Sequence, residues 1–110
     1  MSKFLIDLST KDVRKAKEAL STVIKETPLD YSNTLSMLTG SDVYLKLENL
    51  QKTGSFKVRG AYWKMLNVNK SMPSSVIAAS AGNHGQGTAY AASQLNIPCT
   101  IVMPENASTA

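Results

Sequence analysis

A lysine at position 57 stands where amine chemistry would be favoured. It lies in segment 53–60, TGSFKVRG, which predicts the start of a helix with Ser55 as its N-cap. The positive end of the helix dipole and partial burial beside Phe56 both favour the uncharged amine at Lys57. Because the free amine is the form that attacks an aldehyde, the segment is compatible with a Schiff-base lysine. A solvated lysine in an ordinary first helical turn has the same pattern, so the segment alone leaves both interpretations open.

A glycine-rich segment at 80–87, SAGNHGQG, follows an apolar run and carries the second group of chemically useful residues. Consecutive backbone N–H groups at a strand-to-helix turn can bind an anion, and the helix dipole strengthens that binding. The glycine spacing matches neither the dinucleotide motif nor the nucleotide phosphate loop. The segment therefore suits a small carboxylate or a single phosphate. A tight turn whose glycines only permit close packing is the alternative.

The polar residues of this turn have several possible roles. The single histidine, His84, could be a general base, a ligand or a hydrogen-bonded scaffold, and the scaffold is favoured. Asn83 could orient a ring substituent by a hydrogen bond, or it simply tolerates the turn. The one cysteine, Cys99, excludes an internal disulfide and a cysteine-based zinc cage. With no second histidine and no carboxylate nearby in sequence, we expect no metal site.

The elements that must position these residues follow from hydrophobic periodicity and from turn residues. A strand, a glycine-rich turn, a helix and a second strand in succession predict a βαβ unit and therefore a parallel sheet. The sequence predicts a helix from Ser9 that ends before Pro28, a short helical segment at 32–38, a strand at 43–47, a helix from Ser55, a strand at 76–79, a helix at 85–95 and a strand at 100–103.

Composition narrows the class of protein. The chain has 110 residues, of which 43% are hydrophobic and 18% charged, enough for one globular domain. Its net charge is +4, but the basic residues are dispersed, which argues against a nucleic-acid surface. No apolar run is long enough to span a membrane, and the first residues do not resemble a signal peptide. We therefore expect a cytoplasmic protein without nucleic-acid or membrane partners.

Segments 48–61 and 80–87 together resemble one family closely. They are similar to the serine/threonine dehydratases, and to threonine ammonia-lyase in particular, which are pyridoxal-phosphate enzymes of the tryptophan-synthase-β type. Segments 27–29 and 101–105 also resemble landmarks of that family, so the resemblance extends over about residues 10–110. It implies an α/β, parallel-sheet fold of that type and pyridoxal 5′-phosphate as the cofactor.

The resemblance also implies roles for individual residues. Lys57 would bond the cofactor covalently and later take up the α-proton of an amino-acid substrate, and Phe56 would pack near the cofactor. Asn83 would hydrogen-bond the ring hydroxyl of the cofactor. The reaction implied is α,β-elimination, which converts L-threonine or L-serine to a 2-oxoacid and ammonia. The substrate carboxylate would be held by the turn Ser80, Ala81, Gly82, Asn83 and His84.

Family members run to a few hundred residues, so the resemblance identifies an N-terminal portion of the catalytic region. Residues 1–50 would supply a leading helix and first strand, and residues 51–110 the start of the smaller α/β subdomain. The full-length form would be a dimer or tetramer, and we expect the 110 residues alone to be inactive. One alternative is a truncated, non-catalytic α/β module. Another is serine racemase-like activity, against which Ala81 argues because racemases of the family typically carry a serine there.

Overall fold

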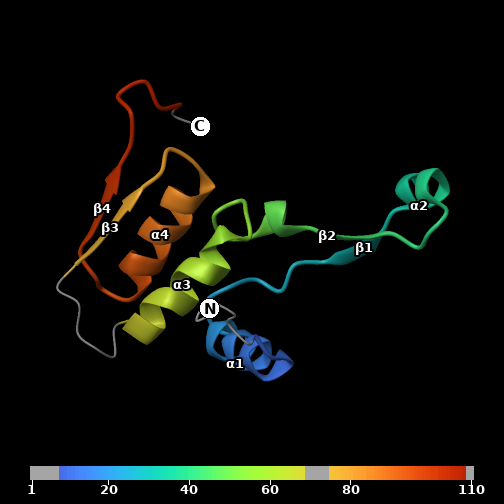
Figure 1. Cartoon of the computed structure of the whole chain (residues 1–110), viewed down its shortest axis with the longest axis horizontal. Helices are drawn as coiled ribbons and strands as arrows, with labels where there is room; N and C mark the ends of the chain where they lie inside the picture. Colours follow the sequence, from blue (N-terminus) through green and yellow to red (C-terminus); the bar gives the residue numbers. More distant parts are fainter. Residues whose placement is uncertain (1–7, 69–74, 109–110) are drawn as a thin grey trace, which may run out of the picture.

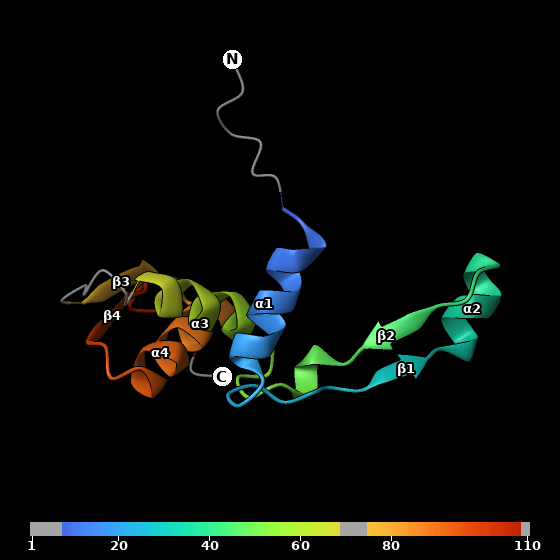
Figure 2. The same cartoon turned by 90° about the horizontal axis from the view of Figure 1, so that it is seen from below.

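The computed structural model describes residues 8–68 and 75–108, which form a body and a projecting arm (Figures 1 and 2). The Cα radius of gyration is 16.9 Å, above the roughly 13 Å expected of a compact chain of this length. The elements in chain order are α1 (Thr10–Leu20), β1 (Leu29–Tyr31), α2 (Asn33–Thr39), β2 (Tyr44–Lys46), the 3-10 turn η1 (Glu48–Leu50), α3 (Lys57–Val68), β3 (Val76–Ala79), α4 (Asn83–Gln94) and β4 (Cys99–Val102).

The predicted βαβ unit is confirmed. Strands β3 and β4 pair in parallel, with Val76 opposite Cys99 and Ala79 opposite Val102, and α4 is the crossover between them. Parallel strands need such a crossover, and the glycine-rich segment provides the turn into the helix. In Figure 1, α4 lies beside this two-stranded sheet and α3 packs against α4.

The core lies where α3, α4 and the end of α1 meet. Apolar side chains at helical spacing on α3 pack against alanines of α4, which are small enough to let the two helices approach closely. Leu20 closes the core from α1. The buried members of this cluster are Leu20, Tyr62, Met65, Ala91, Ala92 and Ile97.

The arm consists of β1, α2 and β2, and Figures 1 and 2 show it extending away from the body. Strands β1 and β2 pair antiparallel, with Leu29 opposite Lys46 and Tyr31 opposite Tyr44. The rings of Tyr31 and Tyr44 meet edge to face, with centroids 5.2 Å apart. The sequence predicted a strand here but no antiparallel pair, because register between two three-residue strands leaves no periodicity to detect.

Two helix starts differ from the predictions. Helix α3 begins at Lys57 rather than at Ser55, and α4 begins at Asn83 rather than at Gly85. Asn83 and His84 therefore belong to the first turn of α4 and not to the loop before it. The prediction placed the glycines at 85 and 87 at the edge of the helix, but both are inside it, where they serve close packing.

Candidate active site

Lys57 opens α3 and carries an exposed side chain. Gly54 takes a left-handed conformation with φ of +68°, which turns the chain into the helix. The buried Ser55 then accepts a hydrogen bond at Oγ from the Lys57 backbone N–H at 3.4 Å, although it lies two residues before the helix and not at the predicted N-cap position. Nζ of Lys57 lies 5.0 Å from the centroid of the Phe56 ring. The amine therefore stands in solvent beside an aromatic face.

Gly87 fixes how closely α4 approaches the start of α3. A Cβ placed at Gly87 would stand 2.9 Å from the Val58 backbone nitrogen and 3.0 Å from the Lys57 carbonyl carbon. These separations are too short for any side chain, and Val58 is fully buried at this contact. The glycine-rich segment thus packs directly against the backbone of Lys57, which joins the two motifs of the sequence in space.

Ser80 organises the turn that leads into α4. Its Oγ accepts hydrogen bonds from the backbone N–H of Gly82 at 3.3 Å and of Gly85 at 3.0 Å. A Cβ at Gly85 would stand 2.8 Å from the Ser80 carbonyl oxygen. Ser80 therefore holds the turn ahead of α4, whose N-cap is Gly82, and Gly85 permits the close packing that the sequence left as an alternative.

The structure groups the predicted site residues into two places. Lys57, Phe56 and His84 line one cleft of about 470 Å³ between α3, β3 and the start of α4. Ser80, Ala81 and Gly82 line a separate hollow of about 210 Å³ near β4. Asn83 is exposed and is not among the residues that line either cavity. The lysine and the histidine are therefore brought together, while the remainder of the turn faces elsewhere.

An ion pair that we did not predict lies next to this site. Arg59 donates to both carboxylate oxygens of Glu48, from Nε at 2.8 Å and from Nη2 at 2.7 Å. The hydroxyl of the buried Thr27 donates to the same carboxylate. Hydrogen bonding from Arg59 is the main cause that lowers the pKa of Glu48 to about 2. Glu48 and Arg59 stood within the motif that carries the resemblance, but their pairing depends on a loop geometry that spacing alone does not give.

The side chain of Gln51 ties the same loop to the segment after α1. Its amide accepts from the Lys25 backbone N–H at 2.9 Å and donates to the Lys25 carbonyl at 2.8 Å. Gln51 is only 4% exposed. The Gln51 amide thus makes the same pair of hydrogen bonds to Lys25 that a neighbouring strand would make to its backbone. These two bonds fix the loop ahead of Lys57.

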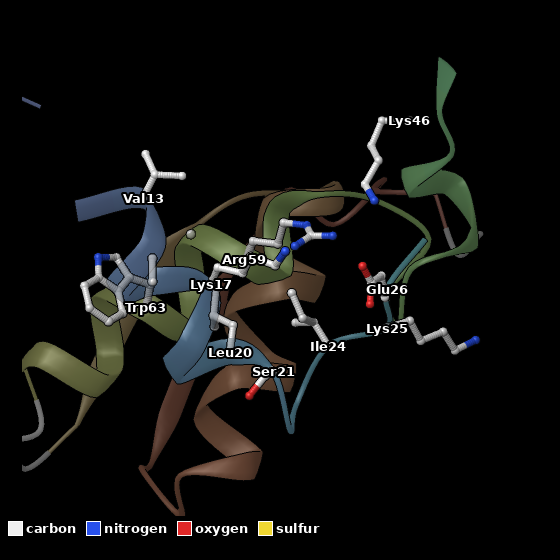
Figure 3. A pocket seen from close by; sticks show the side chains of 12 residues that line it. Val13, Lys17, Leu20, Ser21, Ile24, Lys25, Glu26, Lys46, Arg59 and Trp63 are labelled. Carbon is white, nitrogen blue, oxygen red and sulfur yellow. The ribbon is translucent and has the colours of Figure 1, made fainter. Parts of the chain in front are cut away.

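A second cleft, of about 510 Å³, lies between α1 and α3 (Figure 3). Its apolar part includes Val13, Leu20, Ile24 and Trp63, and Figure 3 shows the Arg59 guanidinium near its centre. Arg59 is paired with Glu48, and the Lys46 ammonium donates to the Thr27 carbonyl. Two of the cations around this cleft are therefore engaged within the protein.

Comparison with known proteins identifies the family. Residues 20–110 match the model of the pyridoxal-phosphate dependent enzymes, so the chain belongs to that family and pyridoxal phosphate is the family's cofactor. The matched region contains both motifs described above. The resemblance that the sequence motifs suggested is thereby confirmed, and so is the α/β fold of this class with its parallel strands.

Individual relatives are threonine ammonia-lyases and related enzymes. L-threonine ammonia-lyase of Thermotoga maritima is 50% identical over 101 residues, which are 91% of this chain and 25% of that protein. The processed form of threonine deaminase isoform 2 from Solanum lycopersicum superposes with a TM-score of 0.72 at 36% identity, covering 92% of this chain and 30% of that one. Serine racemase of Dictyostelium discoideum superposes with a TM-score of 0.80 at 38% identity, covering 90% and 33%. The chain thus spans about a quarter of the length of the curated relative it matches and corresponds to its N-terminal portion.

The residues of the Lys57 cleft fit pyridoxal phosphate in their chemistry. Lys57 offers a primary amine to an aldehyde, and the neighbouring ring of Phe56 is 58% exposed. Ala61, Met65 and Val76 make the rest of the wall largely apolar, which suits a flat aromatic ring. In residues 8–68 and 75–108 we find no group of histidine, cysteine and carboxylate side chains that could hold a metal ion. The helices of the same residues are too short or too polar to cross a membrane.

Proposed function

We propose that this chain supplies the lysine-bearing N-terminal portion of an enzyme that eliminates water from L-threonine or L-serine. The products are a 2-oxoacid and ammonia. The observation that carries the proposal is the position of Lys57, whose exposed amine stands at a helix start beside Phe56 and in one cleft with His84. The identity of 50% to an L-threonine ammonia-lyase supports the same substrate class.

When bound, pyridoxal phosphate acts as an electron sink that acidifies the α-carbon of an amino acid. Lys57 would hold the cofactor through its primary amine, and its Nζ would be the base that takes up the α-proton. Phe56 would pack near the cofactor, and Asn83 would hydrogen-bond its ring hydroxyl. The β-hydroxyl would leave as water, and hydrolysis of the resulting enamine would consume one water molecule and release ammonia and the 2-oxoacid.

The turn from Ser80 to His84 binds the substrate carboxylate in this proposal. Backbone N–H groups at the start of α4 and the helix dipole favour an anion there. Ser80 holds the turn through its hydrogen bonds to Gly82 and Gly85. His84 lines the same cleft as Lys57, whereas Ser80, Ala81 and Gly82 line a separate hollow, so His84 is the residue of the turn that lies with the amine.

The 110 residues contain one part of this machinery. We infer that residues 51–110 begin the smaller subdomain of the catalytic region and that residues 1–50 lead into it. The relatives are three to four times longer. We propose that a longer polypeptide closes the site and forms the homo-oligomer. The chain alone, as a non-catalytic α/β module, would bind the cofactor but would not convert the amino-acid substrate. We place the enzyme in the cytoplasm.

A chimera tests the activity directly. The matching 101 residues of the Thermotoga maritima L-threonine ammonia-lyase are replaced by those of this chain, and 2-oxoacid formation from L-threonine is measured. We expect the chimera to be active and its Lys57→Ala variant to lose activity. Lys64→Ala is the matched control, because Lys64 lines the same cleft. An inactive chimera that folds and binds cofactor, or an active Lys57→Ala variant, contradicts the proposal.

Racemisation is the second candidate, supported by the TM-score of 0.80 to a serine racemase. Removal and return of the α-proton from opposite faces needs a second acid/base group. Ala81 provides none, whereas racemases of the family resemble this chain but typically carry a serine at that place. We expect Ala81→Ser in the chimera to produce measurable D-amino acid from the L-enantiomer. Racemisation by the unmodified chimera would favour this second candidate instead.

A further inference from the structure

The first turn of α3 separates two clefts and presents a different charged residue to each. Lys57 lines the cleft on the β3 side, whereas Arg59 lines the cleft between α1 and α3. Gly60 lines both clefts, so only a single turn of backbone lies between them. Lys57 and Arg59 therefore share one helical turn, and contacts that hold Arg59 in place also hold the backbone of Lys57.

Arg59 is fixed by a carboxylate that is itself anchored. Both carboxylate oxygens of Glu48 accept from the guanidinium, and such a two-point contact sets orientation as well as distance. The buried Thr27 hydroxyl holds the same carboxylate from the segment after α1. The backbone around Glu48 is held too, because Leu47 N–H donates to the Pro28 carbonyl at 3.0 Å.

The opposite side of the turn is held by packing. The Gly87 contact places α4 against the backbone of Lys57 and Val58, with no room for a side chain between them. Gln51 secures the incoming loop through its two bonds to Lys25. Two contacts thus hold the first turn of α3: the ion pair of Arg59 with Glu48 and the close packing at Gly87. The Lys57 side chain projects from this turn.

We infer that Glu48, acting through Arg59, is a positioning residue that fixes the first turn of α3 and thereby the place of the Lys57 amine. The inference deepens the proposed function and rests on it for the chemical role of Lys57. Neither Glu48 nor Arg59 lines the Lys57 cleft, so neither is a catalytic residue. The carboxylate remains charged in moderate acid, since its pKa is held at about 2.

Hydrogen exchange of the whole chain, followed residue by residue by NMR, tests the positioning without any cofactor. Glu48→Gln keeps the size of the side chain but loses the two-point carboxylate contact. We expect the amides of residues 57–60 to exchange roughly tenfold faster, as for the loss of one charge-assisted hydrogen bond. The amides of α4 and β3 should keep their protection. Equal loss of protection in all elements, or no change at 57–60, overturns the inference.

Trapping of pyridoxal phosphate with borohydride tests the consequence for the amine. The yield at Lys57 is divided by the yield at Lys64, which lies in the same cleft and serves as internal control. We expect Glu48→Gln to lower this ratio by about tenfold, the scale of a misplaced reacting group. Glu48→Asp, which retains two carboxylate oxygens, should restore part of it. An unchanged ratio in Glu48→Gln contradicts the inference.

A milder variant keeps the test decisive if Glu48→Gln unfolds. Arg59→Lys keeps the positive charge but cannot make two parallel hydrogen bonds. In a folded chain, Arg59→Lys should also speed exchange of the amides of residues 57–60 and lower the Lys57 to Lys64 trapping ratio. Both effects should be smaller than in Glu48→Gln. The two tests also separate this inference from the proposed function. If the wild-type chain traps no cofactor at Lys57 but Glu48→Gln still speeds amide exchange at residues 57–60, the proposed function is overturned. The role of Glu48 in fixing the first turn of α3 would then still hold.

Discussion

At the scale of single residues, the surroundings of Lys57 depend on groups that do not line its cleft. Glu48 accepts hydrogen bonds from Thr27 and Arg59, and its side chain is only 14% exposed. A carboxylate stabilised in this way releases its proton far more readily in the folded chain than in the unfolded one. Glu48 should therefore make the stability of the chain depend on pH.

The first prediction concerns that pH dependence. The folded pKa of Glu48, about 2, lies below its ordinary value of 4.5, so its contribution is complete above pH 4.5 and is lost as the pH falls toward 2. Glu48→Gln should cost about 1–3 kcal/mol of unfolding free energy at neutral pH, between the values for exposed and buried ion pairs. The difference from wild type should vanish near pH 2. Urea unfolding from pH 7 to 2 measures it.

The exposed Glu105 provides the control for this measurement. Glu105→Gln should unfold like wild type at every pH, because its carboxylate stands in solvent at the surface of the described chain. Asp12, whose pKa is also lowered by its hydrogen bonds with Ser9, is present in all three proteins and cancels in the comparison. A cost of Glu48→Gln that stays constant from pH 7 to 2 would show that charge is not its cause.

At the scale of elements, the contact between α3 and α4 holds the two motifs together. Gly87 allows it, since a Cβ there would stand 2.9 Å from the Val58 backbone nitrogen. Backbone atoms cannot move aside as the end of a flexible side chain can. The contact is therefore the most sensitive point of the packing that we can identify between the two helices.

The second prediction is that Gly87→Ala destabilises the chain. Overpacking of this kind typically costs about 1–3 kcal/mol, which exceeds the helix propensity gained by replacing glycine. Gly60→Ala is the matched control, because Gly60 lies in α3 with open space around its Cβ position. It should be neutral or stabilising by roughly 0.5–1 kcal/mol. Thermal unfolding decides, and a neutral Gly87→Ala would contradict the packing described here.

The order of elements could be predicted because the sequence marks it with strong local signals. A serine followed three residues later by an acid marks the start of α1, where Ser9 N–H donates to the Asp12 carboxylate at 3.0 Å. Alternation and glycine placement predicted the βαβ unit. The pairing of Glu48 with Arg59, and of Gln51 with Lys25, could not be predicted, because both are set by loop paths rather than by periodicity.

The candidate site was predicted in part. The positions of Lys57 at a helix start and of Ser80 in a strand-to-helix turn followed from the dipole and capping arguments. The sequence could not indicate that Asn83 and His84 lie inside α4, because helix boundaries shift by a residue or two under tertiary contacts. It also could not separate the Lys57 cleft from the hollow at Ser80, since that division depends on how α4 is rotated.

At the scale of the whole molecule, the arm leaves apolar surface uncovered. Met37 and Leu38 on α2 are 83% and 76% exposed, and both faces of the β1–β2 pair are exposed as well. Two-stranded antiparallel pairs are marginal in water without a partner surface. The outer face of the β3–β4 sheet likewise exposes Ile77 and Val102. The chain spans about a quarter of the length of its relative from Thermotoga maritima. We therefore expect that residues of a longer polypeptide would cover these apolar surfaces.

The third prediction is that the isolated chain associates with itself through the arm. Apolar patches of this kind drive association in the absence of a covering layer. Sedimentation velocity should show a concentration-dependent increase in mass, and Met37→Lys should reduce it. Thr34→Lys adds the same charge at another exposed position of α2 and should leave association nearly unchanged. A chain that is monomeric at all concentrations would contradict this prediction.

The central claim, that Lys57 is the cofactor lysine, is tested most directly by mapping where pyridoxal phosphate bonds. The purified chain is incubated with the cofactor, reduced with borohydride and digested, and each lysine is quantified by mass spectrometry beside a urea-denatured sample. We predict modification concentrated at Lys57 in the native chain and spread over the lysines in the denatured one. The same spread in both samples would contradict it.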